Sequence, residues 1–398
     1  MFQWIKKYKH FKVFVVISFF CLFFLFDFTS GLSLKDKFSR FSLSRSIYPK
    51  SYKITNENSD LEVYSKLDKS FDSFIKDWNL ASASVAIAKD GKLLYAKAFG
   101  YADKEDSIKA QPYNMYRIAS VSKLITAVAV MKLIEDKKLS LDTKVFGAEG
   151  LLNDTYYLHY VDKRVENITV KNLLNHSAGW TSCWGDHMFI NDIIAKSLKK
   201  PLPVSLQDIV TFALSKRLHF QPGTYSSYCN LGFSILQLVI EKASGQPYES
   251  FVKEKIFYPL NINDANLAFN FDSLRYPNEA RYYEIPEAEK IIAFDGSKKA
   301  VLKCRGGDDI RTLGAAGGWV ISSVSLLKFL LAIDGNDNFP DIITKHSVNR
   351  LVEHEGEFQP LGWKAIYPNG KWWRSGSLPG TSALAVVKND GFTYVFLT

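Results

Sequence analysis

The pattern of apolar and polar positions predicts strands at both ends of the chain and helices between them. Two Asp-Gly turns, at residues 90–91 and 390–391, are flanked by runs rich in branched and aromatic side chains, which is typical of β-hairpins. The predicted strands are residues 83–88, 93–101, 383–387 and 392–397. We therefore expect a mixed α+β fold, in which an antiparallel sheet from both chain ends is flanked by helices, with a helical region inserted.

Apolar residues at helical spacing predict the helices. An amphipathic helix precedes the first hairpin, with its apolar positions at Leu67, Phe71, Phe74, Ile75 and Trp78. Further helices are predicted at residues 170–175, 206–214 and 231–243. No Pro- or Gly-rich linker divides residues 66–398, so we expect one catalytic unit with an active site between the sheet and the helices.

The N-terminal segment has the pattern of an export signal. Four lysines precede residues 13–26, which carry no charge, and Asp27 ends the run. This length is typical of a signal peptide and is short for a membrane-spanning helix. Residues 1–31 thus predict a signal peptide, with an uncleaved anchor at residues 11–28 as the alternative. We expect residues 32–65, rich in Ser and Lys, to be a flexible tether, and the protein to be exported, periplasmic or extracellular, either free or membrane-anchored.

Charge and cysteine content limit the partners. The net charge is +9, and residues 1–53, with ten Lys or Arg and two Asp, account for +8 of it. The remaining chain is nearly neutral, so we expect no nucleic-acid partner. Outside the N-terminal segment, Cys183, Cys229 and Cys304 show no metal-ligand spacing, and the seven histidines are scattered. We predict no metal and no cofactor, and a Cys183–Cys304 bridge stays open.

The first candidate for chemistry is Ser120 with Lys123. Five serines have a lysine three positions later, so this spacing alone is common, but only Ser120 opens a helix as apolar as residues 124–134. In the first turn of a buried helix, the serine lies at the positive end of the dipole, and the desolvated lysine has a lowered pKa. Ser120 is then a nucleophile with Lys123 as its base. A simple N-cap serine is the alternative that this segment alone leaves open.

Two later segments offer complementary groups. Tyr228-Cys229-Asn230 follows a Pro-Gly turn and precedes an apolar helix, where a tyrosine can shuttle protons and an asparagine can orient a lysine and a carbonyl. Arg374-Ser375-Gly376-Ser377 precedes the last hairpin and offers a cation, a hydroxyl and a glycine that lets substrate approach the backbone. Taken singly, the first segment is better explained by packing of Tyr228 and helix capping by Asn230, and the second by a surface turn.

In this order, the three motifs resemble those of the serine β-lactamase superfamily, in its class C β-lactamase and penicillin-binding-protein-like branch. The resemblance runs from about residue 67 to 398 and includes further matching segments at 139–142, 172–179, 244–248, 256–260, 316–318 and 361–363. It implies a β-lactamase/transpeptidase-like fold. It also implies a serine hydrolase that cleaves an amide or ester through an acyl-enzyme, acting on β-lactams, D-amino-acid peptides or simple esters.

The resemblance implies a role for each catalytic residue. Ser120 would be the acylated nucleophile, Lys123 would help to activate it, and Tyr228 would act as acid and base, including in deacylation. Asn230 would position Lys123 and the substrate carbonyl. His176, by the same resemblance, would support a loop and would not be catalytic.

The same resemblance implies substrate-binding roles for Arg374, Ser375, Gly376 and Ser377. Arg374 and Ser375 would bind a substrate carboxylate or stabilise charge, and the amides of Ser120 and Ser377 would form an oxyanion hole. We expect a small-molecule or peptide substrate and a monomer.

Two features depart from the pattern. Arg374 stands where Lys or His is usual, and arginine cannot donate a proton at ordinary pH. The sequence also ends at Thr398 inside the last predicted strand, where relatives continue into a helix, so we expect either a fragment or a domain truncated at its C-terminus. Both departures motivate the alternative of a non-catalytic or acyl-trapped penicillin- or peptidoglycan-binding protein.

Overall fold

The computed structural model describes residues 53–183 and 185–398, and these are built around a seven-stranded antiparallel sheet. Its order is β3-β2-β1-β12-β11-β10-β9. The strands are β1 Ser82–Lys89, β2 Lys92–Asp103, β3 Ile108–Lys109, β9 Ala365–Ile366, β10 Trp372–Leu378, β11 Thr381–Val387 and β12 Phe392–Leu397. The first and last long strands are neighbours, with Ser84 opposite Leu397. This confirms the expected sheet made from both chain ends, and both predicted hairpins.

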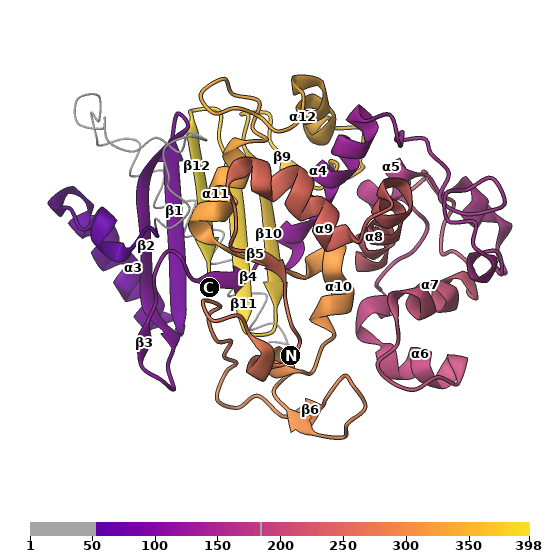
Figure 1. Ribbon diagram of the computed structural model, residues 1–398, viewed down its shortest axis with the longest axis horizontal. Coiled ribbons are helices and arrows are strands. Elements are labelled where there is room, and N and C mark those ends of the chain that lie inside the picture. Colours follow the sequence, from indigo (N-terminus) through magenta and orange to yellow (C-terminus); the bar gives the residue numbers. More distant parts are fainter. Residues whose placement is uncertain (1–52, 184) are drawn as a thin grey trace, which may run out of the picture.

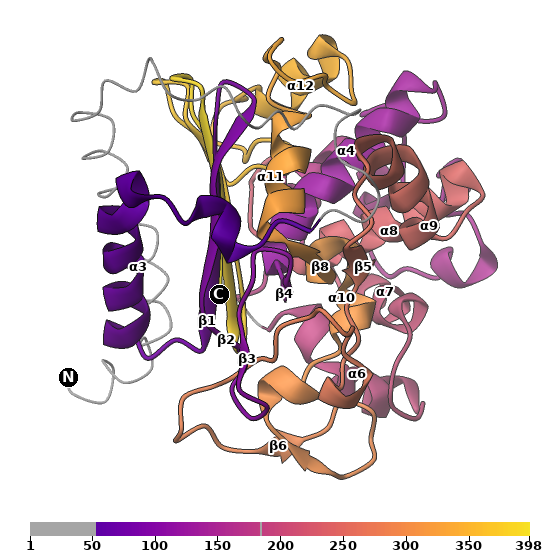
Figure 2. The same cartoon turned by 60° about the vertical axis from the view of Figure 1, so that its left-hand side comes forward.

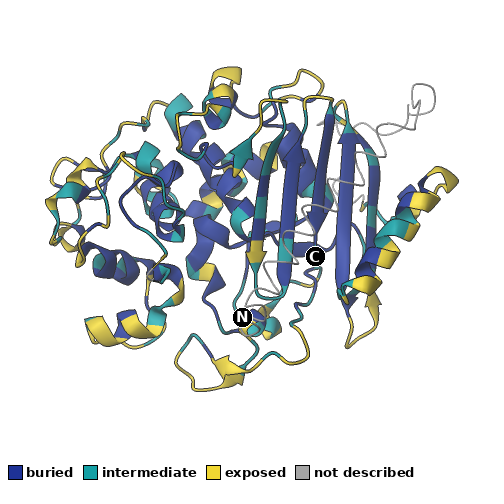
Figure 3. Ribbon diagram, turned by 180° about the vertical axis from the view of Figure 1, so that it is seen from behind, coloured by how far each residue is buried: buried dark blue, intermediate teal, exposed yellow. Residues whose placement is uncertain are grey.

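Helices cover both faces of this sheet. Helix α3 (Ser65–Asp77) lies on one face, and α11 (Ser323–Leu331) and α4 (Ser122–Glu135) lie on the other (Figures 1 and 2). Strands β1 and β12 are therefore buried on both faces (Figure 3), which explains why they are apolar almost throughout. On the α3 face the rings of Phe74 and Phe396 meet edge to face, 5.8 Å apart.

The remaining helices gather on the α4 side of the sheet, as Figure 1 shows, and confirm the inserted helical region. They are α5 Val170–Leu174, α6 Asn191–Leu198, α7 Leu206–Leu214, α8 Asn230–Ser244, α9 Tyr248–Val252, α10 Ile310–Gly317 and α12 Lys345–Val352. Two small sheets complete the fold, formed by β4 Met115–Arg117, β8 Trp319–Ser322 and β5 Ala265–Leu267, and by β6 Ile291–Ile292 with β7 Ala300–Val301.

Short helical turns connect these elements. One of them, η3 (Ala119–Val121), leads directly into α4. The others are η1 Asn56–Ser59, η2 Glu62–Tyr64, η4 Thr155–Tyr157, η5 Lys163–Asn167, η6 His187–Phe189, the π-turn η7 Lys253–Phe257, η8 Tyr258–Leu260, η9 Asp272–Leu274 and η10 Lys303–Arg305.

The predicted tether is wrong for residues 53–65, which pack along the edge of β2. The Asn56 side chain accepts from the amide of Ala98 at 2.7 Å, and the Ser59 hydroxyl accepts from the amide of Ala96 at 2.9 Å. These side chains replace a strand partner for β2, a form of pairing that leaves no apolar periodicity in the sequence. Residues 32–52 and the predicted export signal lie outside the described residues. In the described part of the chain, no helix has both the length and the hydrophobicity needed to cross a bilayer.

Candidate active site

The turn η3 places Ser120 against β10, and Gly376 makes this approach close. A Cβ on Gly376 would lie 2.2 Å from the carbonyl oxygen of Ile118 and 2.7 Å from the amide nitrogen of Ser120. Only glycine fits at this position, because it lets the backbone of Ser120 approach the strand. The sequence suggested that Gly376 lets substrate approach the strand, whereas in the structure the Ser120 turn makes the close approach. Ala119, between the two contacts, adopts φ 46°, a conformation that is costly for a residue with a side chain.

Three reactive side chains converge at this turn. The Ser120 Oγ lies 2.6 Å from the Tyr228 Oη and 3.2 Å from the Lys123 Nζ. Ser120 and Tyr228 are partly accessible, whereas Lys123 is completely buried. A hydroxyl with a phenol and an amine in hydrogen-bond reach is the arrangement of an activated nucleophile.

Lys123 is held by three acceptors. Besides Ser120, its Nζ donates to the Asn230 Oδ1 at 2.7 Å and to the Ala316 carbonyl oxygen at 2.5 Å. Burial lowers its pKa to about 8, partly opposed by Tyr228 and reinforced by Arg374. Desolvation thus brings the amine into the range of a useful base.

Tyr228 is surrounded by cationic groups. Burial favours its neutral phenol, but the charges of Lys123 and Arg374 outweigh this effect and lower the pKa of Tyr228 to about 8. The His176 ring packs 4.6 Å from the Tyr228 ring, and its Nδ1 accepts from the Cys229 amide at 3.4 Å. His176 thus packs under the loop that carries Tyr228, and among the described residues no hydrogen bond joins it to Ser120, which agrees with the supporting role expected for it.

Arg374 faces inward and differs from the carboxylate-binding residue that the sequence suggested. Its side chain is 1% exposed. The guanidinium donates from Nε to the Ser120 carbonyl oxygen at 3.0 Å, from Nη1 to the Gly362 carbonyl oxygen at 3.0 Å, and from Nη2 to the Tyr228 Oη at 3.4 Å. Arg374 therefore lowers the pKa of Tyr228 and ties the Ser120 turn to β10, and it has little capacity left for a substrate carboxylate, so of the two predicted roles the geometry favours stabilising charge.

The register of β10 separates the remaining predicted residues. Side chains alternate along a strand, so the side chains of Ser375 and Ser377 lie on one face of β10, and Arg374 and Gly376 lie on the other. Among the described residues, no hydrogen bond joins either hydroxyl to the site. The backbone of Ser377 is better placed: its partner Ser382 exchanges both hydrogen bonds with Thr398, the residue after β12. The amide of Ser377 therefore points away from β11 toward the free edge of β10, where an oxyanion can be bound.

Two residues of the site carried no signal in the sequence. The Asp186 Oδ2 accepts from the Asn230 Nδ2 at 2.8 Å, which orients the amide so that its oxygen meets Lys123. Lys364 places its ammonium 5.7 Å from the centre of the Tyr228 ring. Neither belongs to a motif with a fixed offset from Ser120, so no local pattern could have identified them.

No metal-binding cluster of three or more His, Cys, Asp or Glu side chains exists in the part of the chain that the structure describes. The thiols of Cys183, Cys229 and Cys304 are free, and Cys304 is buried while Cys183 is exposed. The Cys183–Cys304 bridge is therefore not formed.

The geometry agrees with a comparison of the sequence with known families. The model of the family described as Beta-lactamase matches residues 67–398. The chain belongs to the beta-lactamase family. The putative penicillin-binding protein PbpX of Bacillus subtilis (strain 168) is 27% identical over 318 residues, covering 79% of this chain and 70% of that protein. Protein flp of Staphylococcus aureus (strain N315) is 25% identical over 228 residues, or 57% of this chain, and the match spans 43% of flp.

Solved structures share the fold of this beta-lactamase family member. The octameric penicillin-binding protein homologue from Pyrococcus abyssi has a TM-score of 0.64 at 25% identity, covering 85% of this chain and 73% of that one. The D-amino acid amidase from Ochrobactrum anthropi SV3 has a TM-score of 0.63 at 19% identity, covering 83% and 91%. The β-lactamase/transpeptidase-like fold is thus confirmed, and the family supports serine hydrolase type activity.

Proposed function

We propose that this protein cleaves an amide or ester bond through an acyl-enzyme on Ser120. The carrying observation is the convergence of the Tyr228 Oη and the Lys123 Nζ on the Ser120 Oγ, at 2.6 and 3.2 Å. Family membership supports the reaction class. The substrate, the leaving group and the catalytic role of each residue are part of the proposal.

Acylation begins when the Tyr228 phenolate accepts the proton of Ser120. The Oγ then bonds to the carbonyl carbon, and the resulting oxyanion lies between the amides of Ser120 and Ser377. As the bond to the leaving nitrogen or oxygen breaks, Tyr228 returns the proton to that atom. The charge of Lys123 stabilises the Tyr228 phenolate, and Lys123 forms no covalent bond with the substrate.

Deacylation uses the same groups with water in place of the leaving group. Tyr228 accepts a proton from water, which attacks the ester carbonyl. As the bond from that carbon to the Ser120 Oγ breaks, Tyr228 returns the proton to the Oγ, and the acid is released. Arg374 cannot deliver a proton, but its guanidinium, 3.4 Å from the Tyr228 Oη, stabilises the phenolate in both half-reactions.

The substrate is a small molecule or peptide with an accessible carbonyl, and the protein acts as an exported monomer, attached to the membrane if its N-terminal segment is retained. The names of PbpX and of the amidase suggest penicillins and D-amino acid amides as first compounds to try. Simple activated esters such as p-nitrophenyl acetate measure the reaction without requiring specific contacts between the substrate and the pocket.

Intact-protein mass spectrometry after treatment with a fluorophosphonate or a penicillin tests the proposal. We expect one adduct on Ser120 that is absent from Ser120→Ala, together with turnover of p-nitrophenyl acetate. An unlabelled Ser120 would contradict the hydrolase assignment. A stable adduct without turnover of any ester or of nitrocefin would instead favour an acyl-trapped binding protein.

A further inference from the structure

Lys364 brings a third cation to Tyr228 from outside the three motifs. It lies on the segment between α12 and β9, and its amide donates to the carbonyl oxygen of Trp373 at 3.0 Å. This bond fixes Lys364 beside the first part of β10. Its Nζ then lies 5.7 Å from the centre of the Tyr228 ring.

Lys364 differs from the other two cations in having no acceptor of its own. Lys123 and Arg374 are buried and donate to protein oxygens. The side chain of Lys364 is exposed, and its ammonium makes no hydrogen bond or ion pair with any other described residue. Desolvation against the site, and then the charge of Arg374, lower the pKa of Lys364. An anion from solution would relieve this repulsion.

The position of Lys364 along β10 indicates which part of a substrate it would meet. It pairs with Trp373, whereas the oxyanion amide belongs to Ser377, four residues or about 13 Å further along the strand. Arg374 contacts both Ser120 and Tyr228, so the reacting atoms lie between these two ends. The acyl carbonyl lies toward Ser377, and the leaving group extends past Tyr228 toward Lys364.

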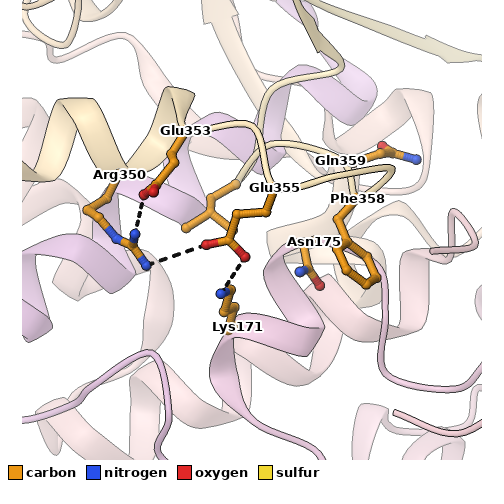
Figure 4. A pocket seen from close by; sticks show the side chains of 8 residues that line it. Lys171, Asn175, Arg350, Glu353, Glu355, Phe358 and Gln359 are labelled. Carbon is orange, nitrogen blue, oxygen red and sulfur yellow. Dashed lines mark hydrogen bonds and ion pairs between the residues drawn. The ribbon is translucent and has the colours of Figure 1, made fainter. Parts of the chain in front are cut away.

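An ion-pair cluster holds the segment that carries Lys364. Glu355 pairs with Lys171 of α5 at 2.5 Å and with Arg350 of α12 at 3.9 Å, as the dashed lines in Figure 4 show. A few residues on, Gly362 packs against α4, where a Cβ would lie 2.7 Å from that of Ala127. The backbone that leads to Lys364 is therefore held at Glu355 and at Gly362, and Lys364 itself is bonded to Trp373, which favours a preformed binding group.

We propose that Lys364 binds a carboxylate carried by the leaving group, so that the site prefers amides and esters whose departing part is an anion. This inference rests on the proposed acyl-enzyme function. During acylation the Ser120 Oγ bonds to the carbonyl carbon, the bond to the leaving atom breaks, and Tyr228 passes the serine proton to that atom. Lys364 exchanges no proton and holds the carboxylate throughout.

Two esters that differ only in this charge test the proposal: 3-carboxyphenyl acetate and 3-carbamoylphenyl acetate. For the full chain we expect a higher kcat/KM for the carboxylate ester, and a preference that shrinks with added NaCl. Lys364→Met should lower kcat/KM for the carboxylate ester about tenfold more than for the amide ester, the value of one partly exposed charge-assisted contact. Lys364→Arg should restore the preference.

The matched control is Lys371→Met, which removes a lysine from the turn before β10 whose ammonium lies over the Tyr367 ring, 5.4 Å from its centre. It should leave the preference intact. Equal losses for both esters in Lys364→Met, or no preference in the unmodified protein, would overturn this inference alone. No turnover of either ester, with Ser120 unlabelled by a fluorophosphonate, would overturn the proposed function and this inference with it.

Discussion

Gly376→Ala offers a direct test of how β10 positions the nucleophile. The new Cβ would lie 2.2 Å from the Ile118 carbonyl oxygen, 2.7 Å from the Ser120 amide nitrogen and 3.0 Å from the Ala119 Cβ. Ordinary contacts begin at 3.4 Å, and two of these atoms are backbone, so the turn and the strand must separate by about 1 Å. The displaced atoms include the Ser120 amide that we assign to the oxyanion hole.

A displacement of this size should be much more damaging to catalysis than to folding. Misplacement by about 1 Å is expected to lower kcat/KM by about 100-fold. Overpacking should lower the free energy of unfolding by about 1–3 kcal/mol. Hydrolysis of p-nitrophenyl acetate measures the first effect, and thermal unfolding measures the second.

Gly232→Ala is the matched control. Gly232 lies inside α8, and a Cβ there would meet its nearest atom, the Leu173 carbonyl oxygen, at 3.4 Å. This substitution should leave kcat/KM unchanged and stabilise the helix by up to about 1 kcal/mol. If Gly376→Ala retained the kcat/KM of the unmodified protein, the proposed contact between β10 and the Ser120 turn would not matter for catalysis.

Three further substitutions probe the charges around the nucleophile. Tyr228→Phe removes the proton shuttle and should lower kcat/KM by at least about 100-fold, and an unchanged rate would exclude Tyr228 as the shuttle. With the pKa values of Lys123 and Tyr228 both about 8, kcat/KM should rise with pH through this region as the base loses its proton. Arg374→Gln removes a cation that lowers both values, so the rise should move to higher pH. Asp186→Asn removes a carboxylate that raises the pKa of Lys123, so the ammonium that stabilises the phenolate should be lost at lower pH and kcat/KM should begin to fall at lower pH on the alkaline side. A rise that stays in place in Arg374→Gln, or an alkaline fall that stays in place in Asp186→Asn, would contradict these assignments.

Much of the fold could be predicted from the sequence, because helices and strands each impose a regular spacing of apolar residues along the chain. Asp-Gly turns between β-rich runs predicted both hairpins, and the apolar run after Ser120 predicted a buried helix. The spacing of Ser120 and Lys123 placed both in one helical turn, because residues three apart lie on one side of a helix. The three motifs in order then indicated which of five similar serines belongs to a site.

The tertiary structure decided how distant residues meet, for which the sequence has no periodic signal. The side chain of Arg374 is enclosed by carbonyl groups of Ser120 and Gly362, so a cation that looked suited to substrate instead serves Tyr228. Asp186 reaches Asn230 from 44 positions away, and Lys364 reaches Tyr228 through a different loop. Local spacing determines which side chains share a face, whereas packing of separate elements determines what each side chain contacts. The sequence by itself therefore determined the family and the candidate nucleophile, and only the packing of β10, α4 and their loops determined which cation contacts the phenol and which faces solvent.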